Sequence, residues 1–356
     1  MKHRVATINP GATSTKVALF EDDICLARAA LDHQFSAEMP LFDQLPARRR
    51  LVQEFLDIQL RDDQHLDAVV GRGGLLPPLM AGTYLITPEL LEISRRGERG
   101  EHASNLGAQL AAEIAAPRGI PAFIVDPVTV DELSAVARIS GLQGLERESI
   151  CHALNIRAVA HRHAREQGRP LDELRLVVAH LGTGVSMAAL AEGRMVDVVN
   201  PRDEGPLGMD RPGALPTFGL LDRCFDAGLT RRQIQGQLLG DGGVFSYLGT
   251  RDLREVLSRR DAGDARAALL FEALAYDVAK WIAAMATVHC GQLDGILLTG
   301  GMAHSHALVD ALSERIRWIG PLFVYPGEDE LQAMAEGALR VLRSEAEPRR
   351  LPTTRA

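Results

Sequence analysis

The chain has 356 residues, which is long enough for two domains with separate hydrophobic cores. Its formal net charge of -8 at pH 7, with no basic patch interleaved with aromatic residues, argues against nucleic acid as the main partner. An apolar content of 46% together with 33 glycines is typical of an α/β protein rich in tight turns.

Cysteine spacing and hydropathy indicate a reducing compartment and no contact with membranes. The four cysteines are scattered without a C-x-x-C pair, which argues against structural zinc and a disulfide framework. No apolar run reaches the length of a transmembrane helix, and the basic N-terminal segment lacks the apolar core of a signal peptide. We therefore expect a cytoplasmic protein that binds neither membranes nor nucleic acid.

The N-terminal segment predicts a hairpin with a polar tip. Apolar runs at residues 5–8 and 17–20 flank the sequence NPGATSTK, residues 9–16, and a third apolar stretch follows at residues 24–30. Gly11 lets the backbone come close to an anion, and Thr13 and Ser14 offer hydroxyl groups. Lys16 can place a cation beside it. Such a turn is either a plain hairpin loop or a cradle for phosphate.

Two polar residues follow predicted strands in the first part of the chain. The strand expected at residues 66–70 leads into a glycine-rich turn that carries Arg72, and the buried strand expected at residues 122–125 leads into Asp126. Open α/β sheets place ligand-binding groups at the carboxyl ends of their strands, so both residues are candidates for a site. A solvated turn arginine and a turn or helix-capping aspartate are the alternatives.

Apolar periodicity predicts several helices. They are expected at residues 47–60, 88–95, 104–116 with Ser104 as N-cap, 147–165 with His152 near its start, and 264–289. Taken alone, His152 is more simply explained as a packed or capping histidine. The helix at residues 264–289 is more simply explained as core or subunit interface.

A second copy of the hairpin pattern begins at residue 176. The apolar run LVVAHL contains His180, and apolar stretches follow from Val185 and at residues 195–199. The turn between the first two strands consists of Gly182, Thr183 and Gly184. The repetition indicates two related halves, and two such turns suit a ligand with several phosphates held in a cleft between domains.

The last part of the chain offers three further candidates. The segment at residues 200–216 has no periodicity, is rich in Gly and Pro, and carries Arg211. A third glycine turn, in LLTGGMAHS, holds Gly300 and Gly301 and would let a flat ring such as adenine approach the backbone. A predicted closing helix is preceded by Glu328, Asp329 and Glu330, which either cap that helix or bind magnesium.

Eight strings resemble, in the same order, motifs of the acetate and butyrate kinases of the sugar kinase, Hsp70 and actin superfamily. They are NPGATSTK, VVGRGGLLPP, EHASNLGA, FIVDPVTVDEL, AHLGTGVS, GPLGMDRPGALPT, LLTGGM and VYPGEDEL, and they span nearly the whole chain. The resemblance implies an α/β fold of two duplicated ribonuclease-H-like, actin-like ATPase domains with a ligand cleft between them. It also implies ATP, Mg2+ and a short-chain carboxylic acid as ligands, and a homo-oligomer formed through the helix at residues 264–289.

The expected domain limits follow from the same resemblance. The N-terminal domain is expected at residues 1–128 plus 329–347, where the last helix returns, and the C-terminal nucleotide-binding domain at residues 129–328. Residues 348–356 are expected to form a disordered tail.

The resemblance also implies roles for individual residues. It implies phosphate contacts at Asn9, Ser14, Lys16 and residues 180–184, adenosine contacts at Gly300 and Gly301, a catalytic role for Asp126, and contacts to the transferred phosphoryl group from His152 and Arg211. In the expected mechanism His152 and His180 act as hydrogen-bond donors. Arg72 is the candidate for the substrate carboxylate. Magnesium is expected near Asn9 and the acids at 328–330. Asp329 stands where acetate kinases carry a metal-linked glutamate, and the sequence leaves the choice among the three acids open.

The expected activity is transfer of the γ-phosphoryl group of ATP to butanoate, giving butanoyl phosphate and ADP by direct in-line transfer. A carboxylic acid with a pKa near ~4 is ionised at pH 7, so no general base is required, and Arg72 and Arg211 would offset the repulsion between the two anions. An apolar acyl pocket is expected from Pro10, Leu75, Leu76, Pro77 and Pro78. The alternatives are a kinase for isobutyrate, propionate or acetate, a sugar kinase with Asp126 as base, and an ATP-binding regulator without turnover.

Overall fold

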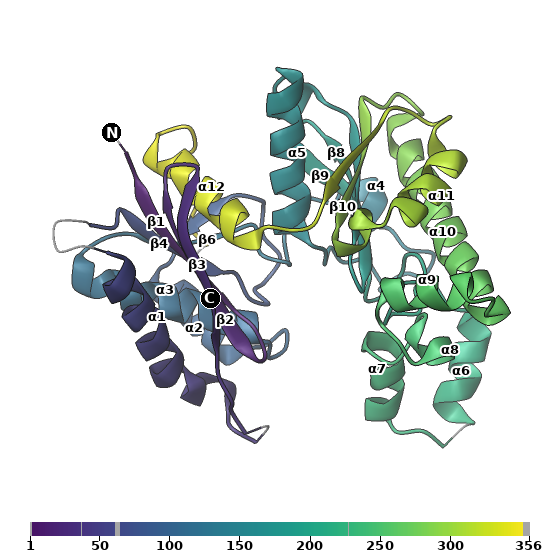
Figure 1. Cartoon of the computed structure of the whole chain (residues 1–356), viewed down its shortest axis with the longest axis horizontal. Helices are drawn as coiled ribbons and strands as arrows, with labels where there is room; N and C mark the ends of the chain where they lie inside the picture. Colours follow the sequence, from purple (N-terminus) through teal and green to yellow (C-terminus); the bar gives the residue numbers. More distant parts are fainter. Residues whose placement is uncertain (1, 37, 61–64, 227, 352–356) are drawn as a thin grey trace. The chain divides into compact units, whose positions relative to one another are not determined.

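The chain folds into two compact units, each with its own sheet and its own core (Figure 1). A computed structural model describes residues 2–36, 38–60, 65–226 and 228–351. Contacts between Cα atoms separate unit 1, which comprises the residues up to Val130 and those from Asp329 onward, from unit 2, residues 131–328.

Unit 1 is a six-stranded sheet with helices on both faces (Figure 1). Its strands, in the spatial order β3-β2-β1-β4-β6-β5, are β1 (Arg4–Pro10), β2 (Ser14–Glu21), β3 (Ile24–Asp32), β4 (Ala68–Arg72), β5 (Thr83–Leu85) and β6 (Ala122–Val125). Its α-helices are α1 (Leu45–Gln59), α2 (Pro88–Arg96), α3 (Leu106–Ala115) and α12 (Glu330–Leu342). Because β1, β4 and β6 are parallel, their carboxyl ends meet at one edge of the sheet.

The pleat of the strands divides the side chains of unit 1 between two layers. Ala6, Ile8, Val17 and Leu19 pack into one core with α1 and α3, and α12 packs against β1, β4 and β6 outside that core. Helix α3 also approaches β4 very closely at Gly107. A Cβ added there would lie only 2.2 Å from the Arg72 carbonyl oxygen. This close approach fixes the beginning of α3 against the end of β4.

Unit 2 is a five-stranded sheet enclosed by helices. In the spatial order β11-β10-β7-β8-β9, its strands are β7 (Leu176–Leu181), β8 (Val185–Ala191), β9 (Arg194–Val199), β10 (Gly295–Gly300) and β11 (Leu322–Pro326). Its α-helices are α4 (Ala135–Arg138), α5 (Ala153–Gln167), α6 (Thr217–Phe225), α7 (Arg231–Leu239), α8 (Phe245–Leu248), α9 (Leu253–Asp261), α10 (Ala265–Ala286) and α11 (His306–Ile316). The main core lies between the sheet and α9, α10 and α11, whereas α5 packs against β7 and β10 outside it.

The two sheets repeat one topology. In both, the first three strands form two antiparallel hairpins. A fourth strand then pairs in parallel with the first, and a fifth pairs in parallel with the fourth. The spatial orders are β3-β2-β1-β4-β6 in unit 1 and β9-β8-β7-β10-β11 in unit 2. In unit 1, strand β5 pairs antiparallel with β6 and forms the edge of the sheet. The prediction of two related α/β halves is confirmed.

Two predicted helix starts are wrong. Helix α5 begins at Ala153 with His152 as its N-cap, not at residue 147, because the side chain of Arg147 is bonded to β9 and to the loop after it. Ser104 is not an N-cap either. It lies in a short 3-10 turn before α3, where the ring of His102 accepts a hydrogen bond from its backbone N–H.

Two other expectations differ from the structure in detail. Arg72 is the last residue of β4, paired with Val125 of β6, and so lies on the strand and not on the turn beyond it. In the expected disordered tail, the backbone of Arg349 exchanges hydrogen bonds with Thr83 and Leu85 because β5 leaves one edge free for pairing. Residues 352–356 of that tail lie outside the described part of the chain.

Among the residues that the structure describes, no helix is both long and apolar enough to span a membrane.

Acid should weaken unit 2 through a buried histidine of α5. His163 is 1% exposed, and its Nδ1 lies 2.9 Å from the hydroxyl of Tyr325, which donates in turn to Glu166. Burial lowers the pKa of His163, so the folded state holds this ring neutral while the unfolded chain protonates it below its ordinary pKa of about 6.5. The stability that depends on the neutral ring is therefore complete above about pH 6.5 and is lost as the pH falls from there toward the lowered pKa.

We expect the free energy of unfolding to fall between pH 7.5 and pH 5.5, and to fall less in His163→Asn, whose amide can still donate to Tyr325. Urea unfolding of both proteins at the two pH values measures this. Equal losses in the two proteins would show that other groups cause the acid sensitivity.

Candidate active site

Unit 1 brings four of the predicted residues to the carboxyl ends of its parallel strands. Asn9 is the next-to-last residue of β1, Arg72 ends β4, Asp126 directly follows β6, and Glu330 begins α12. Glu330 connects two of them, since its carboxylate accepts a hydrogen bond from the Asn9 amide at 2.5 Å and pairs with Arg72 Nη2 at 2.9 Å. These four residues are the unit 1 site.

Arg72 has a donor that the described protein does not use. The residue is 6% exposed, and its buried Nη1 has no hydrogen-bond partner within the described residues. A buried donor without a partner costs free energy, and a guanidinium group can bind a carboxylate or phosphoryl group through two parallel hydrogen bonds. The ion pair with Glu330 holds the group in place and leaves Nη1 for an anion.

Asp126 is held in an unusual backbone conformation. Its φ is +37°, which side-chain-bearing residues rarely adopt, and it is 2% exposed. One carboxylate oxygen accepts a hydrogen bond from the Gly82 N–H at 2.6 Å. Strain of this kind at the end of a strand is typical of functional sites.

Two residues beside the unit 1 site were missed in the sequence, although both lie in the string EHASNLGA. Asn105 accepts a hydrogen bond from Leu75 N–H at 2.9 Å and donates one to the Gly100 carbonyl at 3.0 Å, so it holds the turn that follows Arg72. His102 lies within electrostatic reach of the site. Its pKa is lowered mainly by desolvation and then by the Arg72 cation, while Glu330 opposes the shift.

The first hairpin forms as predicted, with its turn between β1 and β2. Gly11 N–H donates to the Ser14 carbonyl at 2.8 Å, and Lys16 is exposed and lies opposite Asn9 in the register of the two strands. Thr13 is also exposed. A phosphate contact by these groups stays a prediction.

The residues expected to line an acyl pocket differ in burial. Pro10 and Leu76 are buried, Leu75 is half-buried, and Pro77 and Pro78 are exposed. Leu75 is therefore the leucine of this set that keeps contact with solvent.

Unit 2 stacks two of the predicted histidines. The rings of His152, the N-cap of α5, and His180, in β7, lie 3.8 Å apart with an interplanar angle of 12°. His152 Nδ1 lies 2.8 Å from Ser186 Oγ, and His180 Nδ1 lies 2.8 Å from Asn155 Oδ1. Neither partner was predicted from the sequence, because each comes from another element.

These partners limit which ring nitrogens can carry a proton. Ser186 Oγ accepts from the backbone N–H of His152 at 3.3 Å and can donate its own hydrogen to His152 Nδ1, which leaves the proton of a neutral ring on Nε2. Asn155 Oδ1 only accepts, so His180 donates from Nδ1 and carries a proton on Nε2 only as an imidazolium. A carboxylate oxygen of Glu328 lies 3.4 Å from His180 Nε2.

A third unpredicted residue, Thr299 of β10, supports the contact between His180 and Asn155. Its hydroxyl lies 3.2 Å from Asn155 Oδ1 and 3.0 Å from the Gly327 carbonyl oxygen. Asn155 and Thr299 are both buried, so this support for His180 is shielded from water.

Arg211 lies on the turn of the second hairpin. The backbone N–H of Met209 donates to the Thr183 carbonyl at 2.8 Å, and a Cβ added at Gly184 would lie 3.1 Å from Arg211 Nε. That Nε is buried and has no hydrogen-bond partner among the described residues. The structure thus unites the turn at 182–184 with a cation that the sequence placed 27 residues later.

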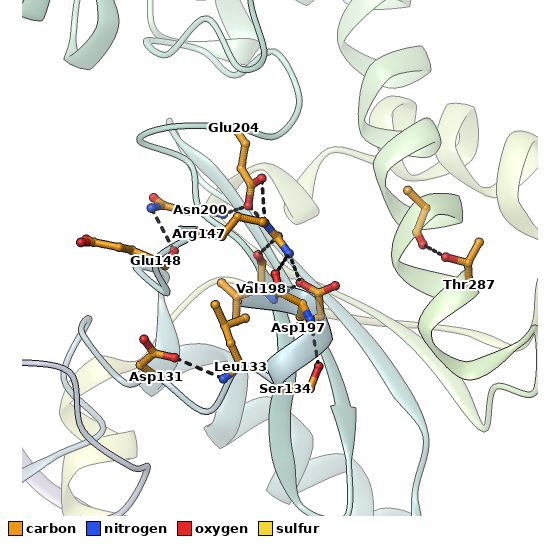
Figure 2. A network of polar contacts seen from close by, with 12 residues as sticks. Asp131, Leu133, Ser134, Arg147, Glu148, Asp197, Val198, Asn200, Glu204 and Thr287 are labelled. Atoms are coloured by element: carbon orange, nitrogen blue, oxygen red, sulfur yellow. Dashed lines mark hydrogen bonds and ion pairs between the residues drawn. The ribbon is translucent and has the colours of Figure 1, made fainter. Parts of the chain in front are cut away.

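The loop that carries Arg211 is anchored at its start by Arg147. Figure 2 shows the guanidinium group between Glu204, Asp197 and the Val198 carbonyl. Two of its nitrogens donate to Glu204, at 2.8 and 3.2 Å, and a third donates to Asp197 at 2.9 Å. Asn200 adds contacts to Asp203 and to the Glu148 carbonyl. The loop therefore has a fixed beginning although it has no regular secondary structure.

The third glycine turn forms at the end of β10. Gly300 has a φ of +89°, and a Cβ there would lie 2.6 Å from the Leu181 carbonyl oxygen, so the position requires glycine. A Cβ at Gly301 would meet nothing within 4 Å, and this residue is exposed. The open surface at Gly301 fits the predicted approach of a flat ring.

The three consecutive acids at the start of α12 have three different partners. Glu328 faces His180 in unit 2, Asp329 caps α12 and pairs with Arg28 at 3.0 Å, and Glu330 contacts Asn9 and Arg72. Within the described residues, no group of three or more His, Cys, Asp and Glu side chains is arranged to hold a metal ion. Of the three acids, Glu330 is the one that accompanies Asn9.

Comparison with known proteins places the chain in a class and then in a family. The crystal structure of Porphyromonas gingivalis acetate kinase matches 96% of this chain and 100% of its own with a TM-score of 0.80 at 20% identity. The crystal structure of a propionate kinase from Francisella tularensis subsp. tularensis SCHU S4 matches 94% of this chain and 98% of its own, with a TM-score of 0.75 at 18% identity. The fold is therefore that of the actin-like ATPases, as predicted.

Sequence comparison identifies the family. A profile described as the acetokinase family matches residues 147–322. The probable butyrate kinase 2 of Caldanaerobacter subterraneus subsp. tengcongensis is 43% identical over 349 residues, which are 97% of this chain and 99% of that protein. The chain belongs to the acetokinase family, and so to the phosphotransferases that have a carboxyl group as acceptor.

Proposed function

We propose that the protein transfers the γ-phosphoryl group of ATP to the carboxylate of a short-chain fatty acid, with butyrate as the preferred acid, and releases an acyl phosphate and ADP. The observation that supports this best is Arg72, a buried arginine fixed by Glu330 with one donor left over for an anion. The 43% identity to a probable butyrate kinase supports the choice of acid.

The reaction joins two anions, so the protein has to offset charge. The carboxylate nucleophile is ionised at neutral pH and needs no base. Asp126 already accepts a hydrogen bond from Gly82 N–H, so its role is to orient groups of the unit 1 site. Arg72 binds the carboxylate, and its positive charge lowers the repulsion that the incoming phosphoryl group meets.

The residues of unit 2 act on the phosphoryl side. Neutral His152 donates from Nε2, and Arg211, lying on Gly184, supplies positive charge at the turn at 182–184. In its imidazolium form His180 would donate from Nε2, where a carboxylate oxygen of Glu328 lies 3.4 Å away. These groups stabilise negative charge as it moves from the γ-phosphoryl oxygens toward ADP.

The residues present fit ATP and magnesium. The open surface at Gly301 would take the adenine ring, and the turns at 11–14 and 182–184 would take phosphates. Asn9 and Glu330 offer the oxygen ligands that magnesium prefers. When bound there, magnesium would neutralise part of the charge on the phosphates.

Glu330 should therefore set the magnesium requirement. Glu330→Gln is expected to raise the magnesium concentration for half-maximal activity by about 10-fold or more, because it removes the charged oxygen ligand beside Asn9. Asp329→Asn is the matched control, since Asp329 is adjacent, exposed and paired with Arg28. Magnesium titrations of both variants at saturating ATP and acid measure the effect. A larger shift in Asp329→Asn would move the metal ligand to that residue.

A hydroxylamine trap for acyl phosphate tests the function. Purified protein, ATP and magnesium are combined with acetate, propionate, butyrate or isobutyrate, and glucose is tested in parallel through ADP release. The strongest acyl hydroxamate signal is expected with butyrate. One methylene is worth only ~1–3 kcal/mol of discrimination, so weaker signals with neighbouring acids are expected too. ADP release with glucose and no hydroxamate from any acid would indicate a sugar kinase instead.

We further propose that the protein is a cytoplasmic homo-oligomer whose contact includes α10. Leu269 and Tyr276, two turns apart on this helix, are 69% and 58% exposed. Size-exclusion chromatography with light scattering tests this, and a monomer at micromolar concentration would contradict it.

A further inference from the structure

Arg48 is a buried charge beneath the turn of the first hairpin. It lies on α1 and is 1% exposed. Its Nη2 donates to the carbonyl oxygen of Gly11 at 3.0 Å, and its Nη1 donates to Thr15 Oγ1 at 2.9 Å. The side-chain oxygen of Gln44, one turn earlier, accepts from Nη2 at 2.7 Å and from Nε at 3.2 Å.

Every hydrogen-bond acceptor of this guanidinium group is neutral. Within the described residues Arg48 forms no ion pair, and its other close neighbour is the ring of Phe35, 5.2 Å from the guanidinium carbon. Burial lowers the pKa of Arg48 to about 10, which still leaves it charged at neutral pH. A buried cation without a carboxylate is costly for folding, so its charge calls for an anion close to the turn.

The contact with Gly11 also sets the direction of one peptide group. In a planar trans peptide the C=O and the following N–H point in opposite directions, and the described chain has no cis peptide bond. Because the Gly11 carbonyl points inward to Arg48, the N–H of Ala12 points outward from the turn. An outward N–H in a glycine-containing turn, with positive charge behind it, is suited to receive a phosphoryl oxygen.

We propose that Arg48 is a positioning residue for phosphoryl transfer: it holds the Gly11–Ala12 peptide with its N–H toward the phosphoryl group and supplies buried positive charge behind it. The proposal rests on the proposed function, in which this turn binds phosphate. Arg48 acts from inside unit 1 and does not touch the substrate. Sequence reasoning gave this residue no role, because α1 and the turn are more than 30 residues apart in the chain.

The test compares Arg48→Gln and Arg48→Lys with the matched control Arg49→Gln. Arg49 is the next residue of α1, is half-exposed and pairs with Glu113 at 3.5 Å. We expect about a 10- to 100-fold loss of kcat/KM for ATP in Arg48→Gln. The loss should be smaller in Arg48→Lys, which keeps the charge but not the fork, that is, the several N–H donors of the planar guanidinium group. Arg49→Gln should change kcat/KM by less than twofold. Affinity for AMP, which lacks the outer phosphates, should stay within twofold in all three.

The readouts separate positioning from a purely structural role. Equal losses of affinity for ATP and AMP, or an unchanged kcat/KM for ATP in a folded Arg48→Gln, would overturn the proposal. If Arg48→Gln does not fold, Arg48→Lys decides, because full wild-type kinetics in that variant would exclude a role for the fork. Failure of the proposed function is a separate result, since in that case the wild-type protein itself forms no acyl phosphate from any acid.

Discussion

Replacing Arg72 by glutamine is expected to lower kcat/KM for the carboxylate substrate by about 10²–10³-fold while the affinity for ATP changes little. Arg72 is buried, is held by Glu330, and its Nη1 has no hydrogen-bond partner among the described residues. A glutamine side chain carries no charge and is too short to offer the two parallel N–H donors of a guanidinium group. Steady-state kinetics with varied acid, together with direct measurement of ATP binding, provide the test.

The matched control for this variant is Arg28→Gln. Arg28 also lies in unit 1 and pairs with Asp329, the neighbour of Glu330, but it is half-exposed, so its loss should change kcat/KM by less than twofold. Added guanidinium should partly restore activity to Arg72→Ala, because the cavity left behind still faces Glu330. If Arg72→Gln retains full activity, the carboxylate is bound by another group.

Replacing Gly107 by alanine should destabilise unit 1 by about 3 kcal/mol or more, at the upper end of what overpacking costs. The added Cβ would lie 2.2 Å from the Arg72 carbonyl oxygen and 2.7 Å from its nitrogen, and backbone atoms in a sheet cannot move aside cheaply. Activity should fall as well, since α3 would have to move away from the strand that carries Arg72.

Gly141→Ala is the control for that variant. A Cβ at Gly141 meets nothing within 4 Å, and its φ is not positive, so its urea unfolding curve should match that of the wild type. An unfolding midpoint of Gly107→Ala close to that of Gly141→Ala would show that α3 and β4 can separate without cost.

The strands and glycine turns of both halves could be predicted from the sequence because they depend on local patterns. A buried strand reads as a short apolar run, and the tight turns need glycine, so β6 was predicted with its observed limits and both hairpins were found. Residues at strand ends were found for the same reason, since Arg72 ends β4 and Asp126 directly follows β6.

The partners of those residues could not be predicted, because they come from distant elements. Asn155, Ser186 and Thr299 orient the two histidines, yet no local pattern distinguishes them from ordinary polar residues. The start of α5 was predicted too early. Arg147 is a residue type that favours helices, but its side chain donates hydrogen bonds to Asp197 and Glu204.

The three acids at the start of α12 show another reason why partners could not be predicted from the sequence. Glu328 belongs to unit 2 and Asp329 to unit 1, so adjacent side chains with the same chemistry enter different environments. Sequence spacing treats such neighbours as one cluster. Only the contacts with His180, Arg28 and Asn9 separate them.

The repeated sheet topology has a consequence for how this enzyme could have arisen. Asn9 and His180 occupy equivalent places, each in the next-to-last pair of its hairpin, opposite Lys16 and Ser186 respectively. Asn9 contacts Glu330, and His180 contacts Glu328. A symmetric dimer of half-length ancestors would have carried the same side chain at both places. Gene fusion allows the two copies to mutate independently, so an amide can stand in one copy and an imidazole in the other, which identical subunits could not have evolved.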